Sequence, residues 1–399
     1  MDYSVTRAET QPRFSVAQEQ TQEASRSGGR SSWPIAAIAV MQSLLWLGHW
    51  LLYATWTAFE PMSADAKREL GIALFLLSIS FTVAAVLSFR YANGLVGTLY
   101  KVSTGWLGIL NFLTWAAGAV WVLDLGLRLA GLDTAATRQG LGLTAFGAAL
   151  LVSAYGFVNA RLVRVRRMTV ELAKLPEAWR GRTALLISDI HLGNVNGAGF
   201  ARRVARMARR LDPSVVFLAG DVYDGAKVDP AKLVEPLMGI QPPSGVYFCG
   251  GNHEDFGDPL AYEAALCEAG IEVLHNQRVV VDGVQIAGVS YGTAGRPLQL
   301  RAFLEGLRLE DGGPSILLNH VPHGLQIAEQ AGVDLQLSGH THGGQVFPFT
   351  LFTRRIFGRF THGLERLGRL QVLTSSGVGT WGPAMRVGSA PEVVLITFA

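Results

Sequence analysis

The chain has 399 residues, of which 49% are hydrophobic and 16% are charged, and its formal net charge is +3. This composition is too apolar for an ordinary soluble protein of this length. The small basic excess comes without a basic and aromatic surface pattern, so nucleic acid is not an expected partner. The two cysteines, Cys249 and Cys267, form neither a metal-binding spacing nor a disulfide framework.

The first 32 residues are polar and rich in Gln, Ser and Arg, without hydrophobic periodicity. Such a segment cannot bury enough apolar surface to fold, so residues 1–32 are predicted to form a disordered tail. The apolar run that follows is too long for a signal peptide and lacks a small-residue cleavage site. We interpret it as the first membrane span.

Four apolar stretches follow, each reaching the ~20 residues needed to cross the bilayer core. They are Pro34–Phe59, Leu70–Phe89, Trp106–Ala130 and Leu141–Val163. They predict a four-helix transmembrane domain over residues 33–165. Arginines precede the first stretch and follow the last, so the positive-inside tendency places both ends in the cytoplasm. We therefore expect a multi-pass protein of the inner (plasma) membrane with a cytoplasmic catalytic domain.

Two residues inside these stretches, His49 and Asp124, are candidates for a functional role. His49 sits among Leu and Trp, and we interpret it as a neutral ring bonded to a neighbouring helix. Asp124 has Arg128 four residues further on, which favours a local ion pair. A transport pathway would require several buried charges, so the pattern does not indicate a transporter.

The periodicity changes after the last stretch. Residues 166–182 read as an amphipathic linker that could lie on the lipid headgroups. From residue 183 to 399, short apolar strands alternate with helical segments, which predicts an α/β domain. This half of the chain holds eight of the nine histidines. This uneven distribution of the histidines indicates a functional site in the second half of the chain.

Five segments of the second half run from an apolar strand into a polar loop: "ALLISDIHLG", "VVFLAGDVYDG", "VYFCGGNHED", "SILLNHVPHG" and "SGHTHGGQ". A buried strand delivers ligands at its end in this way. In the last segment two histidines are two residues apart, so both can point to the same side. The candidate metal ligands are Asp189, His191, Asp221, Asn252, His320, His340 and His342.

Two Asp, one Asn and four His can serve two metal ions if one carboxylate is shared. Each ion then has four protein ligands and keeps positions for water and substrate. Oxygen and nitrogen ligands without a thiolate favour Mn, Fe or Zn over a structural cysteine-type zinc site. Two cations ~3.5–4 Å apart lower the pKa of a shared water and neutralise phosphate oxygens, so no covalent nucleophile is needed.

The order "DIH", "GDVYD", "GNHE", "NHVPH" and "GHTHGG" resembles the five-block signature of the calcineurin-like metallophosphoesterases, over Leu185 to Gln345. The ending "SSGVGTWGPAMRVGSAPEVVLI" is similar to that of a bacterial membrane-attached branch. This branch resembles transmembrane proteins with a metallophosphoesterase domain and the enzymes that cleave UDP-2,3-diacylglucosamine in lipid A synthesis. For residues 183–399 the resemblance implies two mixed β-sheets packed face to face and flanked by helices.

The resemblance also implies roles. Asp189, His191, Asp221 and His342 would hold the first metal, with Asp221 as the bridge. Asn252, His320 and His340 would complete the second. His253 would contact the phosphoryl group or protonate the leaving oxygen, oriented by Glu254 where many members carry Asp. The longer Glu side chain leaves the geometry of this pair open.

Other polar residues near the motifs keep two interpretations. Asp224 either supports the ligands from behind or caps its loop, and His323 either touches substrate or lies on the surface. Arg386 is a candidate phosphate clamp, because a guanidinium matches phosphate geometry. His275 and His362 lie outside the blocks and are interpreted as structural or exposed.

Two functions from different classes fit these patterns. The first is a membrane-bound, metal-dependent phosphoesterase, with a phosphate-ester substrate that is lipid-linked or a nucleotide-lipid. The second is a catalytically silent membrane receptor or scaffold that keeps the fold for binding. The complete ligand set favours the enzyme, because a binding protein has no need to retain all seven ligands and His253.

Overall fold

The computed structural model describes residues 5–6, 33–309 and 313–399, so nearly all of the tail expected at residues 1–32 lies outside the described residues. The chain divides into two compact units. One unit holds residues 33–86 with Ile109–Leu151, and the other holds Leu87–Gly108 with Val152–Ala399. Helices α4 and α5 therefore contribute to both units.

Within the described part of the chain, four helices are long and apolar enough to cross a membrane. This agrees with the four predicted spans, although the helices run beyond the apolar stretches at several ends. Their bounds are Trp33–Phe59 (α2), Ala64–Ser88 (α3), Gly94–Leu129 (α4) and Ala135–Asn159 (α5).

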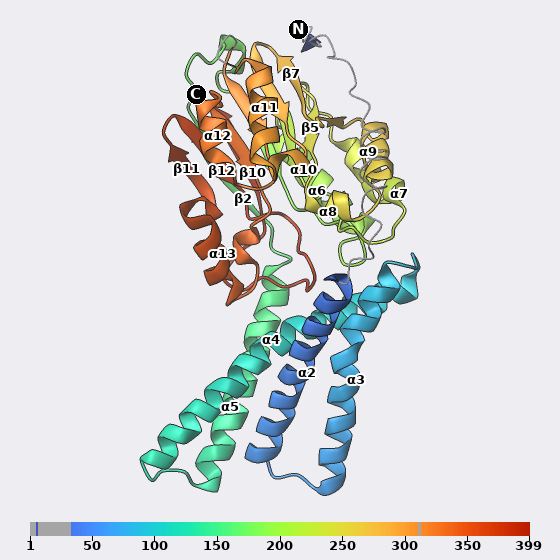
Figure 1. Cartoon of the computed structure of the whole chain (residues 1–399), viewed down its shortest axis with the longest axis vertical. Coiled ribbons are helices and arrows are strands. Elements are labelled where there is room, and N and C mark those ends of the chain that lie inside the picture. The colour runs from blue at the N-terminus through green and yellow to red at the C-terminus, as the bar shows by residue number, and fades with distance from the viewer. Residues whose placement is uncertain (1–4, 7–32, 310–312) are drawn as a thin grey trace. The chain divides into compact units, whose positions relative to one another are not determined.

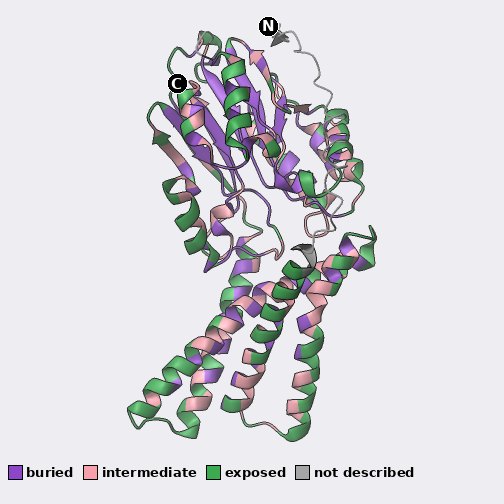
Figure 2. Ribbon diagram, viewed as in Figure 1, coloured by how far each residue is buried: buried purple, intermediate pink, exposed green. Residues whose placement is uncertain are grey.

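The outer surface of these helices is apolar. Leu44, Val122 and Leu151 are each more than 60% exposed, and Figure 2 shows exposed positions along all four helices. Large apolar side chains exposed over a whole surface are suited to hydrocarbon and not to water. The four helices therefore have the character of membrane spans.

His49 and Asp124 are both buried. Asp124 is 1% exposed, and its two carboxylate oxygens lie 2.8 Å from Nε of Arg128 and Nε of Arg138. The predicted i,i+4 pair is thus confirmed, and α5 supplies a second arginine. The Nδ1 atom of His49 lies 2.7 Å from the carbonyl oxygen of Leu45 in its own helix.

The second half of the chain forms two mixed β-sheets, as predicted (Figure 1). In the described residues, the larger sheet has the order β1-β7-β8-β9-β10-β12-β11 and the smaller one β2-β13-β3-β4-β5-β6. The first comprises Val5–Thr6 (β1), Gln277–Val281 (β7), Val284–Gly288 (β8), Ser315–Leu318 (β9), Leu335–Ser338 (β10), Gly363–Leu367 (β11) and Leu370–Thr374 (β12). The second comprises Arg164–Val170 (β2), Thr183–Ile187 (β3), Val215–Ala219 (β4), Val246–Cys249 (β5), Glu272–Val273 (β6) and Glu392–Phe398 (β13).

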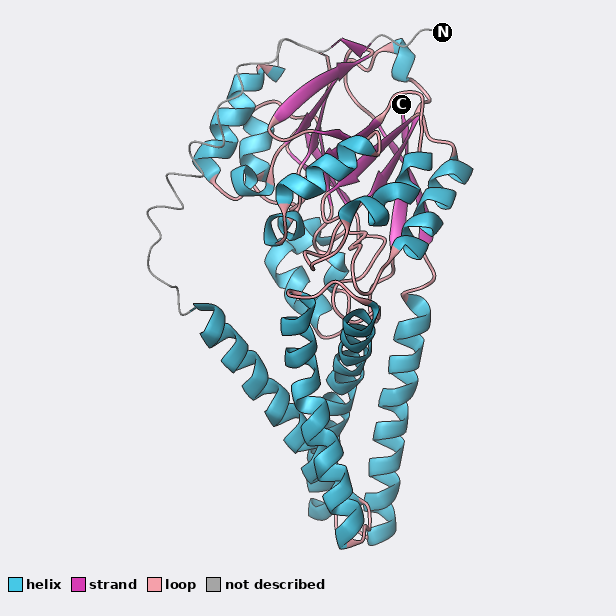
Figure 3. Ribbon diagram, turned by 90° about the vertical axis from the view of Figure 1, so that its right-hand side faces the viewer, coloured by secondary structure: helices cyan, strands magenta, loops and turns pink. Residues whose placement is uncertain are grey.

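Side chains of the central strands alternate between two cores. In β3, Ala184 and Leu186 face the core between the sheets, while Leu185 and Ile187 face a second core under the helices. This is the period of two expected for a strand buried on both faces. Figure 3 shows helices outside the strands. Those of the smaller sheet are Ala198–Leu211 (α6), Pro230–Val234 (α7) and Pro259–Glu268 (α9), and those of the larger sheet are Pro297–Leu307 (α11) and Leu325–Gln330 (α12).

The structure differs from the linker expected at residues 166–182. Residues Arg164–Val170 form the edge strand β2, which pairs in parallel with β13 along its whole length. Further on, Trp179 is fully buried and donates its indole N–H to the carbonyl oxygen of Val281. This segment is therefore part of the sheet domain, because its apolar side chains pack on protein and not on headgroups.

The five polar loops follow the carboxyl ends of β3, β4, β5, β9 and β10. Strands β3, β4 and β5 are parallel to one another, and so are β9 and β10. The carboxyl ends of parallel strands lie at one edge of a sheet, where ligand sites form in α/β proteins. This arrangement brings the loops of each sheet together.

Candidate metal centre

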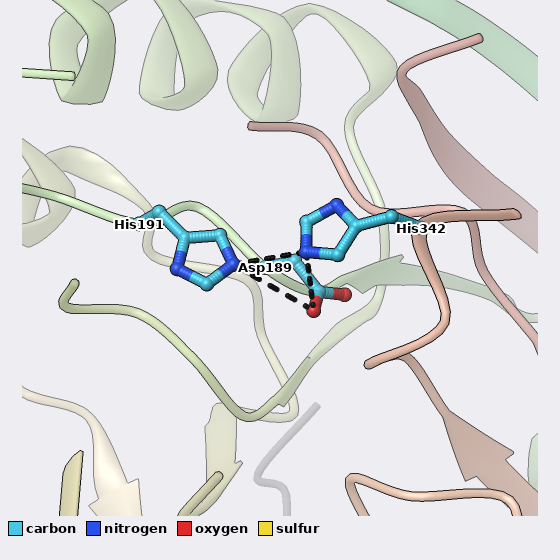
Figure 4. Close-up of side chains that lie close together, drawn as sticks. All are labelled: Asp189, His191 and His342. Atoms are coloured by element: carbon cyan, nitrogen blue, oxygen red, sulfur yellow. Dashed lines mark hydrogen bonds and ion pairs between the residues drawn. The ribbon is translucent and has the colours of Figure 1, made fainter. Parts of the chain in front are cut away.

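Asp189, His191 and His342 form one group of potential metal ligands. Their rings and carboxylate point towards one another (Figure 4). The Nε2 atoms of the two histidines are 3.0 Å apart, and Nε2 of His342 lies 3.5 Å from Oδ1 of Asp189. These residues come from the loops after β3 and β10, so both sheets contribute to the group.

Asp221, His320 and His340 form a second group. The Oδ2 atom of Asp221 lies 3.1 Å from Nε2 of His320, which lies 3.3 Å from Nδ1 of His340. The other ring nitrogen of His320 lies 2.8 Å from the carbonyl oxygen of Ala219. That contact sets the orientation of the ring, as is usual for a histidine that ligates a metal.

Asp221 also belongs to a third group with His191 and His253. Its Oδ2 atom lies 3.9 Å from Nε2 of His191 and 4.0 Å from Nε2 of His253. One carboxylate oxygen thus faces members of all the groups. This is the position that a shared ligand needs.

The backbone of the site is strained. In L-residues a positive φ costs about 1 kcal/mol or more, so it persists only where surrounding contacts impose it. Most of the predicted ligands adopt this conformation. They are Asp189 (φ 55°), His191 (51°), Asp221 (52°), His340 (68°) and His342 (49°).

Two glycines allow the loops to approach closely. A Cβ atom at Gly339 would collide with the Asp189 carboxylate, and one at Gly251 would collide with that of Asp221. In place of side chains, neighbouring backbone N–H groups reach these carboxylates: that of His340 donates to Asp189 at 3.0 Å and that of His253 to Asp221 at 2.9 Å. Both glycines are therefore required by the packing of the ligand loops.

A buried polar atom without a partner supports a fit to metal ions. Among the described residues, the Oδ1 atom of Asn252 is buried and has no hydrogen-bond partner. Leaving a buried polar atom unpaired costs about 1–3 kcal/mol. An amide oxygen in this position is a suitable ligand for a divalent cation, as predicted for Asn252.

The protonation of the rings also suits metal binding. Burial lowers the pKa of His191 to about 3 and that of His340 to about 4, so both rings are neutral at pH 7. A metal binds the neutral imidazole. Burial opposes the charge of His320 too, but the carboxylate of Asp221 outweighs it and raises the pKa of His320 to about 10. A cation beside Asp221 would replace that proton.

The predicted pair of His253 and Glu254 requires a correction. Glu254 accepts from the backbone N–H groups of Gly251 at 2.7 Å and of Asp221 and Tyr223 at 3.0 Å. It therefore holds the two ligand loops together and does not orient the imidazole. The Nδ1 atom of His253 instead lies 3.0 Å from the carbonyl oxygen of Asp224.

The remaining sequence candidates are distributed as follows. The Asp224 carboxylate accepts from the N–H of Ala226 in its own loop and from that of Asn194 in the loop after β3, so it caps its loop and also supports the loop of Asp189 and His191. Arg386 is fully buried and donates to backbone carbonyls, which does not fit a phosphate clamp. Outside the site, His275 pairs with Glu263 and His362 with Glu392, as the structural interpretation of both histidines predicts.

Two aromatic residues of the site were not anticipated from the motifs. The ring of Trp381 lies 5.6 Å from that of His253 and is edge-on to it, and the ring of Phe357 lies 6.1 Å from that of His340. Trp381 is 57% exposed. A tryptophan between glycines in "GTWGP" is the signal that could have identified it.

Two mixed sheets with Asp and His side chains gathered at strand ends define the class of metal-dependent phosphoesterases. A sequence model described as calcineurin-like phosphoesterase matches residues 182–344. An uncharacterized metallophosphoesterase of Aquifex aeolicus is 33% identical over 257 residues, which cover 62% of this chain and 97% of that protein. The chain belongs to the calcineurin-like phosphoesterase family, whose members hold divalent metal ions.

Two other relatives carry "transmembrane" in their names. The transmembrane protein with metallophosphoesterase domain of Danio rerio is 34% identical over 264 residues, covering 62% of this chain and 60% of the relative. That of Bos taurus is 31% identical over 305 residues, covering 71% of this chain and 66% of the relative. The match to the Danio rerio protein thus spans three fifths of its length.

Proposed function

We propose that this protein is a membrane-bound, dinuclear-metal-dependent phosphoesterase that hydrolyses a phosphodiester, phosphomonoester or pyrophosphate bond with water as the nucleophile. One observation carries the proposal. The Oδ2 atom of Asp221 faces His320, His191 and His253, at 3.1, 3.9 and 4.0 Å. Asp221 would therefore be the ligand that both ions share.

The other ligands divide between the two ions. The first ion is assigned the group of Asp189, His191 and His342. The second is assigned His320 and His340, with the amide oxygen of Asn252. The ligand set of oxygen and imidazole nitrogen favours Mn, Fe or Zn. When bound, such ions lower the pKa of water and offset the negative charge of a phosphate.

His253 is assigned to the leaving oxygen. Its Nδ1 atom is held by the carbonyl oxygen of Asp224, which accepts, so Nδ1 carries a hydrogen. The opposite nitrogen, Nε2, is directed towards Asp221 and is the atom that can exchange a proton with a substrate. A histidine in this position acts as a general acid that protonates the departing group.

We further propose a lipid-linked or nucleotide-lipid substrate, of the kind represented by UDP-2,3-diacylglucosamine. Helix α13 (Phe349–Phe357) ends at the aromatic ring that lies next to His340. Its exposed side chains are largely apolar, and so is Trp381 on the other side of the site. Acyl chains are suited to such a surface. The exposed side chains of α13 include Phe349, Leu351, Phe352 and Ile356.

For the location, we propose the inner (plasma) membrane with the phosphoesterase domain in the cytoplasm. Arg161, Arg164, Arg166 and Arg167 follow the fourth span, and cytoplasmic flanks of spans are enriched in such residues. A cytoplasmic domain would meet lipid precursors at the inner leaflet. A residue-399 tag that reacts from outside intact cells would contradict this orientation.

The test uses the full chain in detergent, because removing residues before Met168 would cut strand β2. The protein is loaded with Mn, Fe or Zn, and hydrolysis of bis-p-nitrophenyl phosphate is measured. We expect metal-dependent turnover that Asp221→Asn abolishes, while Asp229→Asn, at an exposed helix cap, leaves it unchanged. Bound metal without turnover would instead indicate the silent receptor or scaffold. Comparing UDP-2,3-diacylglucosamine with small diesters in the same detergent tests the substrate class.

A further inference from the structure

The fully buried guanidinium of Arg386 connects several parts of the site. Its Nη1 atom donates to the carbonyl oxygen of the metal-ligand candidate His342 at 2.7 Å. Its Nη2 atom donates to the carbonyl oxygens of Gly379 at 2.6 Å and Ser376 at 2.8 Å. A planar guanidinium with five donors can satisfy several carbonyls at once, which an ammonium cannot do in the same geometry.

These acceptors belong to two loops, of which one carries a ligand of the first group. His342 lies in the loop after β10, and Ser376 and Gly379 follow β12. The backbone N–H of Gly379 in turn donates to the carbonyl oxygen of Asp189 at 2.8 Å. Arg386 thus ties the loop of one ligand to a loop that is bonded to the backbone of another.

Arg386 also contacts the ring of His342. Its Nη2 atom lies 3.1 Å from Nδ1 of that ring. Because a guanidinium can only donate, Nδ1 accepts, and the ring directs Nε2 towards Asp189 at 3.5 Å. The contact thus fixes which way the ring of His342 faces, with Nε2 on the side of the Asp189 carboxylate.

The segment around Arg386 is itself held by the end of α5. Asn159, the last residue of that helix, donates from Nδ2 to the carbonyl oxygens of Arg386 at 3.0 Å and Ser389 at 2.9 Å. The N–H of Arg386 donates to the carbonyl oxygen of Gly156 at 2.9 Å. Asn159 is 3% exposed and lies in the same compact unit as the metal centre.

We propose that Arg386 is a positioning residue for His342, and that Asn159 holds Arg386 in place, so that metal binding at the first group depends on the last turn of the fourth membrane helix. The inference rests on the metal centre of the proposed function. Groups that orient metal ligands from behind change metal affinity by about 10- to 100-fold when they are removed. An effect of this size is large enough to detect, so a measurement of metal affinity can test the proposal.

The charge of Arg386, taken alone, predicts the opposite change in metal affinity. A buried cation next to a metal site repels a metal ion, so removing the charge of Arg386 would by itself tighten binding. Positioning predicts weaker binding, because the loop of His342 and the loop that bonds to the backbone of Asp189 lose their common donor. Arg386→Gln and Arg386→Met both remove the charge, so the direction of the change separates the two effects.

The experiment titrates the full chain in detergent with Co²⁺ and follows the visible absorption of the bound ion, without substrate. We expect Arg386→Gln and Arg386→Met to weaken the first site about 10- to 100-fold, with occupancy restored at high Co²⁺. Asn159→Ala, which leaves the arginine in place, should weaken it about tenfold through two lost hydrogen bonds. The control is Arg182→Met, which removes a largely buried arginine that pairs with Asp282, and it should change nothing at the first site.

Binding that is unchanged or tighter in Arg386→Gln would overturn the positioning role. Unchanged Co²⁺ affinity in Asn159→Ala would overturn the link to α5, even if the arginine variants fail to fold. Arg386→Lys keeps the charge but lacks the planar guanidinium with its several donors. A Co²⁺ affinity between those of the unmodified protein and Arg386→Met therefore supports positioning. If the unmodified protein binds Co²⁺ but hydrolyses nothing, the proposed activity fails, while this inference is still decided by the affinities.

Discussion

Two carboxylates, Asp124 in the membrane helices and Asp221 at the metal centre, are almost equally buried, at 1% and 2% exposed. Each oxygen of Asp124 has its own arginine at 2.8 Å. Asp221 instead directs one oxygen at several imidazoles between 3.1 and 4.0 Å away. A buried charge with complete partners stabilises a fold, whereas one that directs a single oxygen at several potential metal ligands is poised to bind a cation.

The surroundings of Asp221 and Asp124 also differ, in backbone strain and in unpaired polar atoms. Next to Asp221 the chain adopts strained backbone at five predicted ligands and leaves Oδ1 of Asn252 unpaired. Around Asp124 the neighbours are helical, and the partner arginines lie on α4 and α5. Strain and unpaired polar atoms cost stability, so they persist where function requires them.

The largest expected effect is on Asp221. Asp221→Asn should lower hydrolysis by about 10³-fold or more, because it removes the shared ligand and with it the charge stabilisation of the transition state. Metal content of the purified protein should fall at the same time. The thermal midpoint checks that the chain is folded. Full activity in this variant would contradict the shared-ligand assignment.

At Asp124 the effect should be on stability and not on chemistry. Asp124→Leu leaves Arg128 and Arg138 without their common partner, and we expect a loss of about 1–3 kcal/mol, reduced from the fully buried case because both arginines are partly exposed. Unfolding of the full chain in detergent measures it. A specific loss of kcat at unchanged stability would mean that the two carboxylates do not differ in the way described.

A smaller effect is expected at α13. Phe352→Ser and Ile356→Ser should raise KM for an acylated substrate about tenfold, since each removes part of an apolar contact surface. The KM for bis-p-nitrophenyl phosphate should not change. Leu298→Ser, at an exposed leucine of α11, is the matched control. Equal changes for both substrates would contradict a role in binding acyl chains.

The smallest effect concerns His275. Its hydrogen bond to Glu263 raises the pKa of this histidine, so the pair stabilises the fold fully below the unfolded pKa of ~6.5 and loses that contribution as pH rises through the folded value. Because both side chains are partly exposed, at 47% and 32%, we expect Glu263→Gln to cost about 0.2–1 kcal/mol at pH 5.5 and less at pH 9. Denaturant midpoints at the two pH values measure this. A cost that is independent of pH would exclude the ion pair.

The gathering of the candidate ligands could be predicted because most of them follow a strand that is readable from its apolar run, and the ends of parallel strands meet. The hydrogen-bond partner of His253 could not be predicted, because adjacency in sequence does not fix where the side chain of Glu254 points. Strand β2 was missed because its partner, β13, lies more than 200 residues away. The role of Arg386 likewise depends on acceptors from distant loops, which spacing does not reveal.

The position of β13 has a consequence for how the protein is made. This strand lies between β2 and β3, although it follows both of them in the chain by more than 200 residues. The four apolar helices and every predicted ligand are synthesised before it. The smaller sheet therefore acquires its full set of neighbours only after β13 has been made, and until then the β2 and β3 edges stay open to other partners, including chaperones.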